Sequence, residues 1–269
     1  MSNRIEAAFE RARSQNAAAF MPFITAGDPD LATTAAVIEE MARRGADLVE
    51  VGVPYSDPVA DGPTIQASYV RALASGFKVA QLFDTIKDLR MRCQVPILTM
   101  VSFSIVSRMG PANYFLKAAS AGVDGVIIPD LPADEGGAVT KLAEAAGLCP
   151  VLLLAPTTPD ERVQRIVRHS RGFIYYISVT GTTGARRELP PDLADHIARI
   201  KALTGTPVAV GFGVSDAAQV ASVARVADGV IVGSAIVRKM GEFAGRPRAE
   251  LVQGVGDFVA QLAEAKKRG

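Results

Sequence analysis

Short apolar runs alternate with longer amphipathic segments along the whole chain. An apolar run bounded by turn residues is typical of a strand that is buried on both faces. The segments between the runs place apolar residues at helical spacing, with charged residues on the opposite face. We therefore predict eight strands, at residues 18–26, 47–53, 96–101, 125–129, 150–155, 172–178, 207–213 and 228–234. Helices are predicted between them, for example at residues 30–45, 111–122, 133–147, 158–170 and 215–226.

Turn and capping residues agree with this register. Glycines stand where three of the helices should end, and short polar residues stand where three should begin. The stretch from residue 63 to residue 92 is longer than one helix requires, so we expect two helices there. The glycines are Gly45, Gly122 and Gly147, and the N-cap candidates are Asp30, Thr158 and Ser215.

Strands that alternate with helices form parallel βα units. Eight such units in 269 residues predict an α/β fold, a closed (β/α)8 TIM barrel, for which ~250 residues are typical. No change in composition marks a linker, so we expect a single barrel domain over residues 1–269. The stripe Ile5, Ala8, Phe9 and Ala12 predicts an extra N-terminal helix before the first strand.

Composition excludes several classes of function. The chain carries 29 basic and 28 acidic residues, so it lacks the charge excess that binding to nucleic acid or to an anionic membrane needs. No apolar run approaches the ~18 residues of a membrane span, and the charged N-terminus does not resemble a signal peptide. Cys93 and Cys149 suggest neither a disulfide framework nor a metal site. We expect both to be reduced, in a cytoplasmic protein.

In the strand predicted at residues 47–53, Glu50 stands inside the apolar run from Leu48 to Val53. Burial of an unpaired carboxylate is costly and raises its pKa. Because side chains alternate along a strand, Glu50 points into the barrel if Val49 and Val51 face the helices. The alternative is a structural carboxylate paired with an interior Lys or Arg, but the predicted strands contain no basic residue. We therefore predict that Glu50 donates or accepts protons.

Asp61 follows Glu50 by eleven residues, in a loop that contains Pro54, Pro58 and Pro63. Active sites of TIM barrels lie at the C-terminal ends of the strands and in the loops that follow them. Asp61 is therefore a candidate partner of Glu50 in an acid/base pair. Turn or N-cap chemistry also explains an aspartate before a glycine.

The last three predicted strands end in glycine-rich turns. Glycine lets a backbone approach a ligand closely, and a helix N-terminus offers free N–H groups. TIM barrels often bind phosphate in the loops after strands 7 and 8. A phosphate site is therefore predicted, although each glycine alone is compatible with an ordinary turn. The candidate contacts are Gly184, Gly211, Gly213, Gly233 and the Ser234 hydroxyl.

Three aromatic residues, Phe23, Tyr175 and Phe212, stand near strand ends. They could line an apolar pocket, and packing in the barrel core is the alternative for each. The polar, glycine-hinged stretch 178–190 has the character of a lid loop, with an ordinary solvated loop as its alternative.

Six segments, spread over nearly the whole chain, carry a recognisable pattern. They are PFITAGDP (22–29), VEVGVPYSDPVADGPTIQ (49–66), GVIIPDLP (125–132), TGTTGAR (180–186), PVAVGFGVS (207–215) and DGVIVGSAIV (228–237). Together they resemble the tryptophan synthase alpha chain family, and the second segment is highly specific. The resemblance implies a lyase of tryptophan biosynthesis. Its reaction is the retro-aldol cleavage of indole-3-glycerol phosphate to indole and glyceraldehyde 3-phosphate.

The resemblance also implies roles for particular residues. Glu50 falls on the general acid/base of the family, and Asp61 falls on its second catalytic carboxylate. This chain would use no cofactor. Its implied partner is the pyridoxal-phosphate beta chain, in an αββα assembly that passes indole through a tunnel, with no nucleic-acid or membrane partner. The implied substrate contacts are Phe23, Tyr175, Thr183, Gly184, Gly211, Phe212, Gly213, Gly233 and Ser234.

One corner departs from the family pattern. After the third strand the family commonly has Tyr and Asn in a Met-x-Tyr-x-Asn motif, whereas this chain has Ser102 and Ser104 after Met100. The contacts of this loop are therefore open, and Phe103 is a candidate to compensate. Three alternatives also stay open: a free-standing lyase, a non-catalytic barrel that only activates a partner, and another phosphate-binding barrel enzyme. Retention of both carboxylates argues against the non-catalytic barrel.

Overall fold

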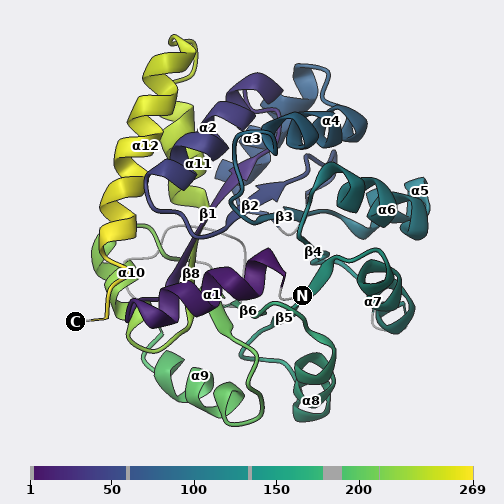
Figure 1. Cartoon of the computed structure of the whole chain (residues 1–269), viewed down its shortest axis with the longest axis vertical. Coiled ribbons are helices and arrows are strands. Elements are labelled where there is room, and N and C mark those ends of the chain that lie inside the picture. Colours follow the sequence, from purple (N-terminus) through teal and green to yellow (C-terminus); the bar gives the residue numbers. More distant parts are fainter. Residues whose placement is uncertain (1–2, 59–60, 133–134, 178–189, 212, 269) are drawn as a thin grey trace.

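A computed structural model describes residues 3–58, 61–132, 135–177, 190–211 and 213–268. Its eight parallel strands follow one another in chain order around a barrel that closes between β8 and β1 (Figure 1). Seven strands lie within their predicted runs, and β5 begins at Cys149, one residue before the run predicted at 150–155. The strands are β1 Ala19–Thr25, β2 Val49–Gly52, β3 Ile97–Met100, β4 Gly125–Ile127, β5 Cys149–Leu154, β6 Ile174–Ile177, β7 Val208–Gly211 and β8 Gly229–Val232.

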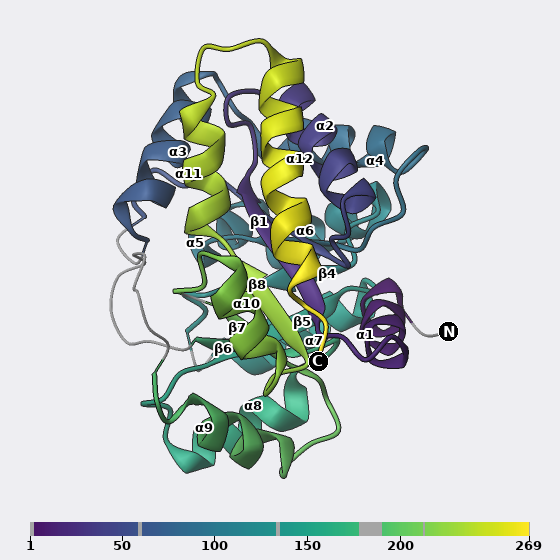
Figure 2. The same cartoon turned by 90° about the vertical axis from the view of Figure 1, so that its left-hand side faces the viewer.

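Helices surround the barrel, and Figure 2 shows α11 and α12 side by side on its outside. The two helices expected between residues 63 and 92 are α3 and α4. The helices in the described residues are α1 Arg4–Ser14, α2 Leu31–Arg43, α3 Pro63–Ala74, α4 Val79–Leu89, α5 Phe103–Met109, α6 Pro111–Ala121, α7 Gly136–Ala145, α8 Asp160–His169, α9 Leu193–Lys201, α10 Ala217–Ala224, α11 Ser234–Glu242 and α12 Arg248–Glu264. None of these is long and apolar enough to cross a membrane.

Two of the predicted helix starts are wrong by one or two residues. Asp30 is confirmed as the N-cap of α2, because its side chain accepts a hydrogen bond from the Thr33 amide. Thr158 instead accepts from the Ala155 amide within the preceding turn, and α8 begins at Asp160. Asp216, not Ser215, caps α10. The three glycines predicted at helix ends all adopt positive φ: Gly45 at 101°, Gly122 at 94° and Gly147 at 85°.

Alternation along β2 separates two hydrophobic layers. Val49 and Val51 pack in the layer between the strands and the helices, while Leu48 packs in the barrel interior. The interior layer also contains Ile5 and Phe9 of α1, which closes the N-terminal end of the barrel, as the predicted apolar stripe of this helix requires. Glu50 therefore faces the interior, between the plugged end and the open end.

A repeated polar contact joins the strands at the N-terminal end of the barrel. A side chain just before each even-numbered strand accepts a hydrogen bond from an amide of the preceding odd-numbered strand. Three of the four side chains are aspartates, and each aspartate also binds a Lys or Arg. Contacts at this end of a TIM barrel typically serve fold stability rather than catalysis. The pairs are Asp47 with Phe20, Asp124 with Ile97, Ser170 with Leu152 and Asp228 with Val208.

Candidate active site

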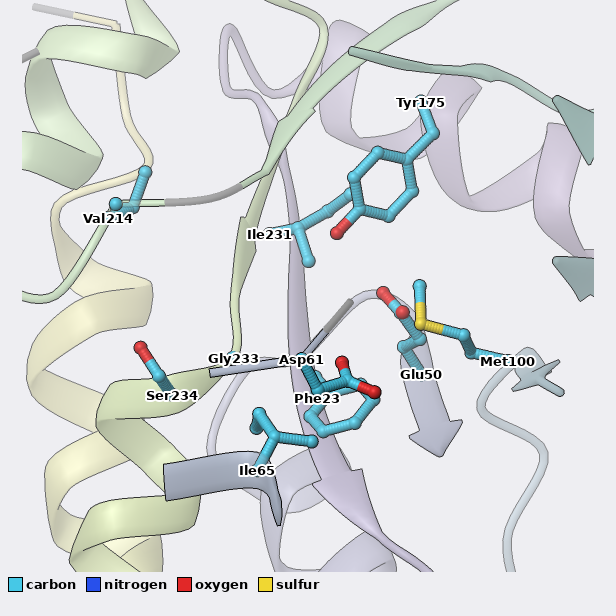
Figure 3. A pocket seen from close by; sticks show the side chains of 11 residues that line it. Phe23, Glu50, Asp61, Ile65, Met100, Tyr175, Val214, Ile231, Gly233 and Ser234 are labelled. Atoms are coloured by element: carbon cyan, nitrogen blue, oxygen red, sulfur yellow. The ribbon is translucent and has the colours of Figure 1, made fainter. Parts of the chain in front are cut away.

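A pocket of about 510 Å³ opens at the C-terminal ends of the strands, where TIM barrels place their active sites. Figure 3 shows the side chains around it. Carboxylates lie on one side, the turn before α11 lies on the other, and apolar side chains lie between them. The lining residues are Phe23, Glu50, Asp61, Ile65, Met100, Tyr175, Gly213, Val214, Ile231, Gly233 and Ser234.

Glu50 reaches this pocket from the middle of β2, where it pairs in register with Phe23 of β1 and Leu98 of β3. Its side chain is 2% exposed, and its Oε1 atom has no hydrogen-bond partner among the described residues. Burial, and to a smaller extent the negative charge of Asp61, raises the pKa of Glu50 to about 8. A buried carboxyl with a strongly raised pKa in a pocket is a candidate functional group.

Asp61 lies in the loop between β2 and α3, and Gln66 of α3 holds this part of the loop in place. The Gln66 side-chain amide donates to the carbonyls of Asp61 at 2.7 Å and Pro58 at 3.2 Å. The Asp61 amide itself donates to the Pro58 carbonyl. Burial, and then the charge of Asp130, raises the pKa of Asp61 to about 6. The backbone is thus fixed by a helix residue, while the carboxylate remains directed at the pocket.

The two carboxyl groups differ in protonation near neutral pH. With a pKa of about 8, Glu50 is mostly the neutral acid at pH 7. With a pKa of about 6, Asp61 is mostly the anion. Two titratable groups whose environments separate their pKa values can act as an acid and a base in one site. The pocket therefore offers one proton donor and one fixed negative charge.

Apolar side chains form the middle of the pocket. Phe23 and Tyr175 line it, as we predicted from their positions near strand ends. Glycine makes room for both rings. A Cβ atom at Gly211 would lie 2.5 Å from the Tyr175 hydroxyl oxygen, and one at Gly52 would clash with the Phe23 ring. Gly211 thus lies behind Tyr175, and it is not among the residues that line the pocket.

Four apolar lining residues were not among the sequence predictions: Ile65, Met100, Val214 and Ile231. Ile231 lies on β8 and belongs to the interior layer, so its inward direction follows from strand alternation. Met100 ends β3, and Ile65 lies in the first turn of α3. No sequence signal distinguishes such residues from ordinary core residues.

The opposite side of the pocket has the features expected of an anion site. Gly213, with φ of 82°, lies in the turn after β7, and Gly233 and Ser234 lie at the start of α11. The N-cap residue of this helix, Gly233, offers no capping side chain, so the first amides can donate to an anion, and the helix dipole favours a negative charge there. These are three of the five candidate phosphate contacts.

The other predicted site residues lie outside the described part of the chain. Thr183, Gly184 and most of the expected lid stretch 178–190 fall in the gap between residues 177 and 190. Phe212 lies in a gap of one residue. Their roles stay predictions.

The corner that departs from the family motif makes contacts of its own. The Ser102 hydroxyl lies 2.7 Å from an Asp130 carboxylate oxygen and 2.9 Å from the Ser104 hydroxyl. The Phe103 amide donates to the other Asp130 oxygen at 2.7 Å. None of these residues lines the pocket, and the Phe103 ring packs against the outer core. Met100 is what this strand end contributes to the pocket wall.

Comparison with known proteins assigns this barrel to a family. A family model described as the tryptophan synthase alpha chain matches residues 9–267. The chain belongs to the tryptophan synthase alpha chain family. It is 45% identical to the tryptophan synthase alpha chain of Geobacter sulfurreducens over 263 residues, which cover 98% of each chain. It is 44% identical to that of Geotalea daltonii over 90% of this chain and 92% of the relative.

Solved structures agree. A chain in a Mycobacterium tuberculosis tryptophan synthase structure superimposes with a TM-score of 0.90 at 33% identity, over the full length of both chains. A mutant tryptophan synthase alpha-subunit from Pyrococcus furiosus gives a TM-score of 0.84 at 38% identity, over 93% of this chain and 99% of that one. The expected TIM barrel and the resemblance are confirmed.

Membership of this family supports the expected reaction class, pathway and partner. This tryptophan synthase alpha chain family member is a lyase of tryptophan biosynthesis, and its activity is the alpha reaction. The family works without a cofactor in the alpha chain and partners a beta chain. The alternative of an unrelated phosphate-binding barrel enzyme is wrong. The roles of individual residues do not follow from membership alone.

Proposed function

We propose that this chain cleaves indole-3-glycerol phosphate with Glu50 moving the protons and Asp61 holding the indole nitrogen. The observation that carries this proposal is the buried Glu50 carboxyl, which has no partner for Oε1 among the described residues and faces a pocket with an apolar middle. Its Oε1 atom is available to a substrate atom, because no contact from the described residues competes for it.

The resting protonation states suit the first step. The neutral Glu50 carboxyl donates its proton to C3 of the indole ring, which carries the glycerol side chain. Positive charge then develops on the ring nitrogen. The Asp61 carboxylate accepts a hydrogen bond from the indole N–H and stabilises that charge, an electrostatic contribution that is often the largest in catalysis.

Bond cleavage returns the proton. The ionised Glu50 now accepts the proton of the glycerol hydroxyl next to the ring. The bond from C3 to the glycerol carbon breaks, its electron pair returns to the ring, and the carbinol becomes the aldehyde of glyceraldehyde 3-phosphate. Indole leaves as a neutral molecule, and Glu50 is again protonated. A group with a pKa near the working pH performs both transfers efficiently.

The remaining lining residues position the substrate. The indole ring lies between Phe23, Tyr175 and Ile231, and the phosphate lies at Gly213, Gly233 and Ser234, together with the predicted contacts Thr183, Gly184 and Phe212. Gly211 keeps the space that Tyr175 occupies. Binding energy at the phosphate can assist the reacting centre, because the phosphate takes no part in the chemistry itself.

We also propose the αββα assembly with the pyridoxal-phosphate beta chain, a cytoplasmic location and a single barrel domain over residues 1–269. The two cysteines, Cys93 and Cys149, are buried and unpaired, which supports a reducing compartment.

The test is indole release from indole-3-glycerol phosphate by the purified chain, alone and titrated with beta chain. We expect Glu50→Gln to lose at least about a hundredfold in kcat, since general acid–base catalysis contributes that much or more. Asp84→Asn, an exposed change on α4, is the matched control and should leave kcat unchanged. Indole release that persists in Glu50→Gln contradicts the assigned role.

The same titration separates the remaining alternatives. A catalytic partner of beta chain should gain activity as beta chain is added. High activity alone, unchanged by beta chain, favours the free-standing lyase. Absence of indole release under every condition, together with activation of beta chain, favours the non-catalytic barrel.

A further inference from the structure

A second pocket lies on the outside of the barrel, between α7 and α8. Both helices pack on β5, and Figure 1 shows them next to each other on the outside of the barrel. The pocket measures about 870 Å³ up to its open mouth and shares no lining residue with the active site. A volume of this order suits a small organic ligand. Its lining residues are Ile128, Pro129, Leu131, Pro132, Gly136, Gly137, Thr140, Leu152, Leu153, Arg162, Arg165, Ile166 and His169.

The floor of the pocket is apolar, and β5 supplies part of it. Leu152 is only partly buried and packs against the outer layer, whereas Leu153 packs against the interior layer and the other four residues of this strand are buried. In a parallel barrel both faces of a strand are normally covered. Ile128 and Ile166 extend the same apolar surface from the end of β4 and from α8.

The rim of the pocket is basic. Arg162, Arg165 and His169 are exposed residues of α8, three and four positions apart, and therefore lie on one face of the helix. The first turn of α7 lines the opposite side, and its N-cap residue, Glu135, makes no side-chain cap hydrogen bond, so the positive end of the helix dipole faces the same space.

These basic groups have no acidic partner among the described residues. Neighbouring arginines do: Arg171 pairs with Glu144 of α7, and Arg199 pairs with Asp160. Asp160 is in the first turn of α8 itself, but its carboxylate is directed to α9. Within the described part of the chain, the positive charge at the mouth of the pocket is therefore available to a bound anion.

We infer that this pocket binds a small amphipathic anion, with a ring or short alkyl chain on the leucine and isoleucine floor and a carboxylate or phosphate at the arginine rim. Arginine suits both head groups, because its planar guanidinium donates two parallel hydrogen bonds. The site is independent of the proposed reaction, and its occupant need not resemble the substrate.

The test is a calorimetric titration of the full-length chain with 4-phenylbutanoate and with 4-phenylbutyl phosphate. The alcohol 4-phenylbutan-1-ol, which has the same ring and alkyl chain but no charge, is the control ligand. The two anions report which head group the rim prefers. Both should bind more tightly than the alcohol. The double variant Arg162→Gln/Arg165→Gln should weaken the anions roughly tenfold while leaving the alcohol unchanged, a modest factor because the arginines are exposed.

Two further variants make the test specific. Gly137→Leu should block all three probes. Gly137 lines the pocket, and a Cβ atom there meets no other atom within 4 Å, so a leucine side chain can occupy part of the pocket. Arg168→Gln is the control: Arg168 is also exposed on α8 and does not line the pocket. Glu50→Gln should leave binding unchanged, which separates this site from the active site.

Three outcomes overturn the inference: no binding of either anion, an effect of Arg168→Gln as large as that of the double variant, or loss of binding in Glu50→Gln. Because the readout is direct binding, these outcomes do not depend on whether the chain cleaves indole-3-glycerol phosphate.

Discussion

The carboxyl groups of Glu50 and Asp61 line one pocket, and the charge of Asp61 helps to raise the pKa of Glu50 to about 8. The two groups are therefore coupled: the anion that is proposed to hold the indole nitrogen also keeps a proton on the general acid. Removing either carboxylate should change the chemistry of the other, so the two variants need not have additive effects.

The first prediction is a bell-shaped pH profile of kcat/KM. The proposed mechanism needs Asp61 ionised and Glu50 protonated. Activity should therefore rise with pH through about 6 and fall again through about 8. The measurement is the rate of indole release at low substrate concentration from pH 5 to 9.5. A plateau that extends unchanged above pH 9 contradicts the role of Glu50 as an acid.

The second prediction concerns Asp130, which is exposed and lies outside the pocket lining. Its charge raises the pKa of Asp61, so Asp130→Asn should move the acidic limb of the profile to lower pH. The alkaline limb, which belongs to Glu50, should stay in place. Because Asp130 is exposed, the displacement should shrink as salt is added. An acidic limb that does not move, at low salt, excludes this coupling.

The third prediction is that Glu50 lowers the stability of the fold at alkaline pH. Its pKa is raised from 4.5 when unfolded to about 8 when folded, so between these values the folded state binds more protons than the unfolded state. The free energy of unfolding should therefore fall as pH rises from about 4.5 to about 8. Glu50→Gln removes this dependence and should gain about a few kcal/mol relative to wild type at pH 8. Urea denaturation at pH 5 and pH 8 measures the difference between the two proteins.

The strand pattern could be predicted because a parallel barrel buries both faces of each strand. Most predicted runs extend beyond the strands, as residues 18–26 do beyond Ala19–Thr25, because Ala18 and Ala26 are buried although they lie outside the strand. Helix starts were less certain. Thr158 and Ser215 are good capping residues, but Asp216 caps α10, and α8 follows Pro159 without a side-chain cap from that residue while Thr158 binds the Ala155 amide. A short polar residue can bind an amide of a turn as readily as one of a helix.

The candidate site could be predicted only in part. Glu50 could be predicted because a carboxylate is unusual in an apolar strand. Turn or N-cap chemistry also explained Asp61, and only the resemblance of the surrounding segment to the family favoured a catalytic role. Ile231 and Met100 line the pocket but are apolar residues of apolar strands. Whether such a residue touches a neighbour or a ligand depends on the packing of the whole barrel, which no local pattern records.

The fourth prediction separates stability from activity. Asp124, at the closed end of the barrel, accepts hydrogen bonds from the Ile97 amide and from Arg4 and Arg90. The Arg90 side chain is only 10% exposed, so Asp124→Ala leaves it without its carboxylate partner. We expect a loss of about 3–5 kcal/mol in the free energy of unfolding, the usual cost of breaking a buried pair.

The kcat of Asp124→Ala should be unchanged at a temperature where the variant is folded, since the active site is at the other end of the strands. Asp160→Asn breaks an exposed ion pair instead and should cost less than about 1 kcal/mol. A large fall in kcat at full folding, verified by circular dichroism, contradicts the division between the two ends of the barrel.

The last prediction tests how Gly211 acts without lining the pocket. A methyl group at this position would lie 2.5 Å from the Tyr175 hydroxyl oxygen and 2.7 Å from its ring, so Gly211→Ala must displace the ring into the space proposed for indole. Displacements of about 1 Å in a site can cost roughly a hundredfold in rate, and we expect kcat/KM to fall by at least about tenfold. Gly205→Ala is the control, because a Cβ atom there meets nothing within 4 Å. Tyr175→Ala/Gly211→Ala should lose no more activity than Tyr175→Ala alone if Gly211 acts only through the ring, and a further loss in the double variant shows a direct contact with the substrate.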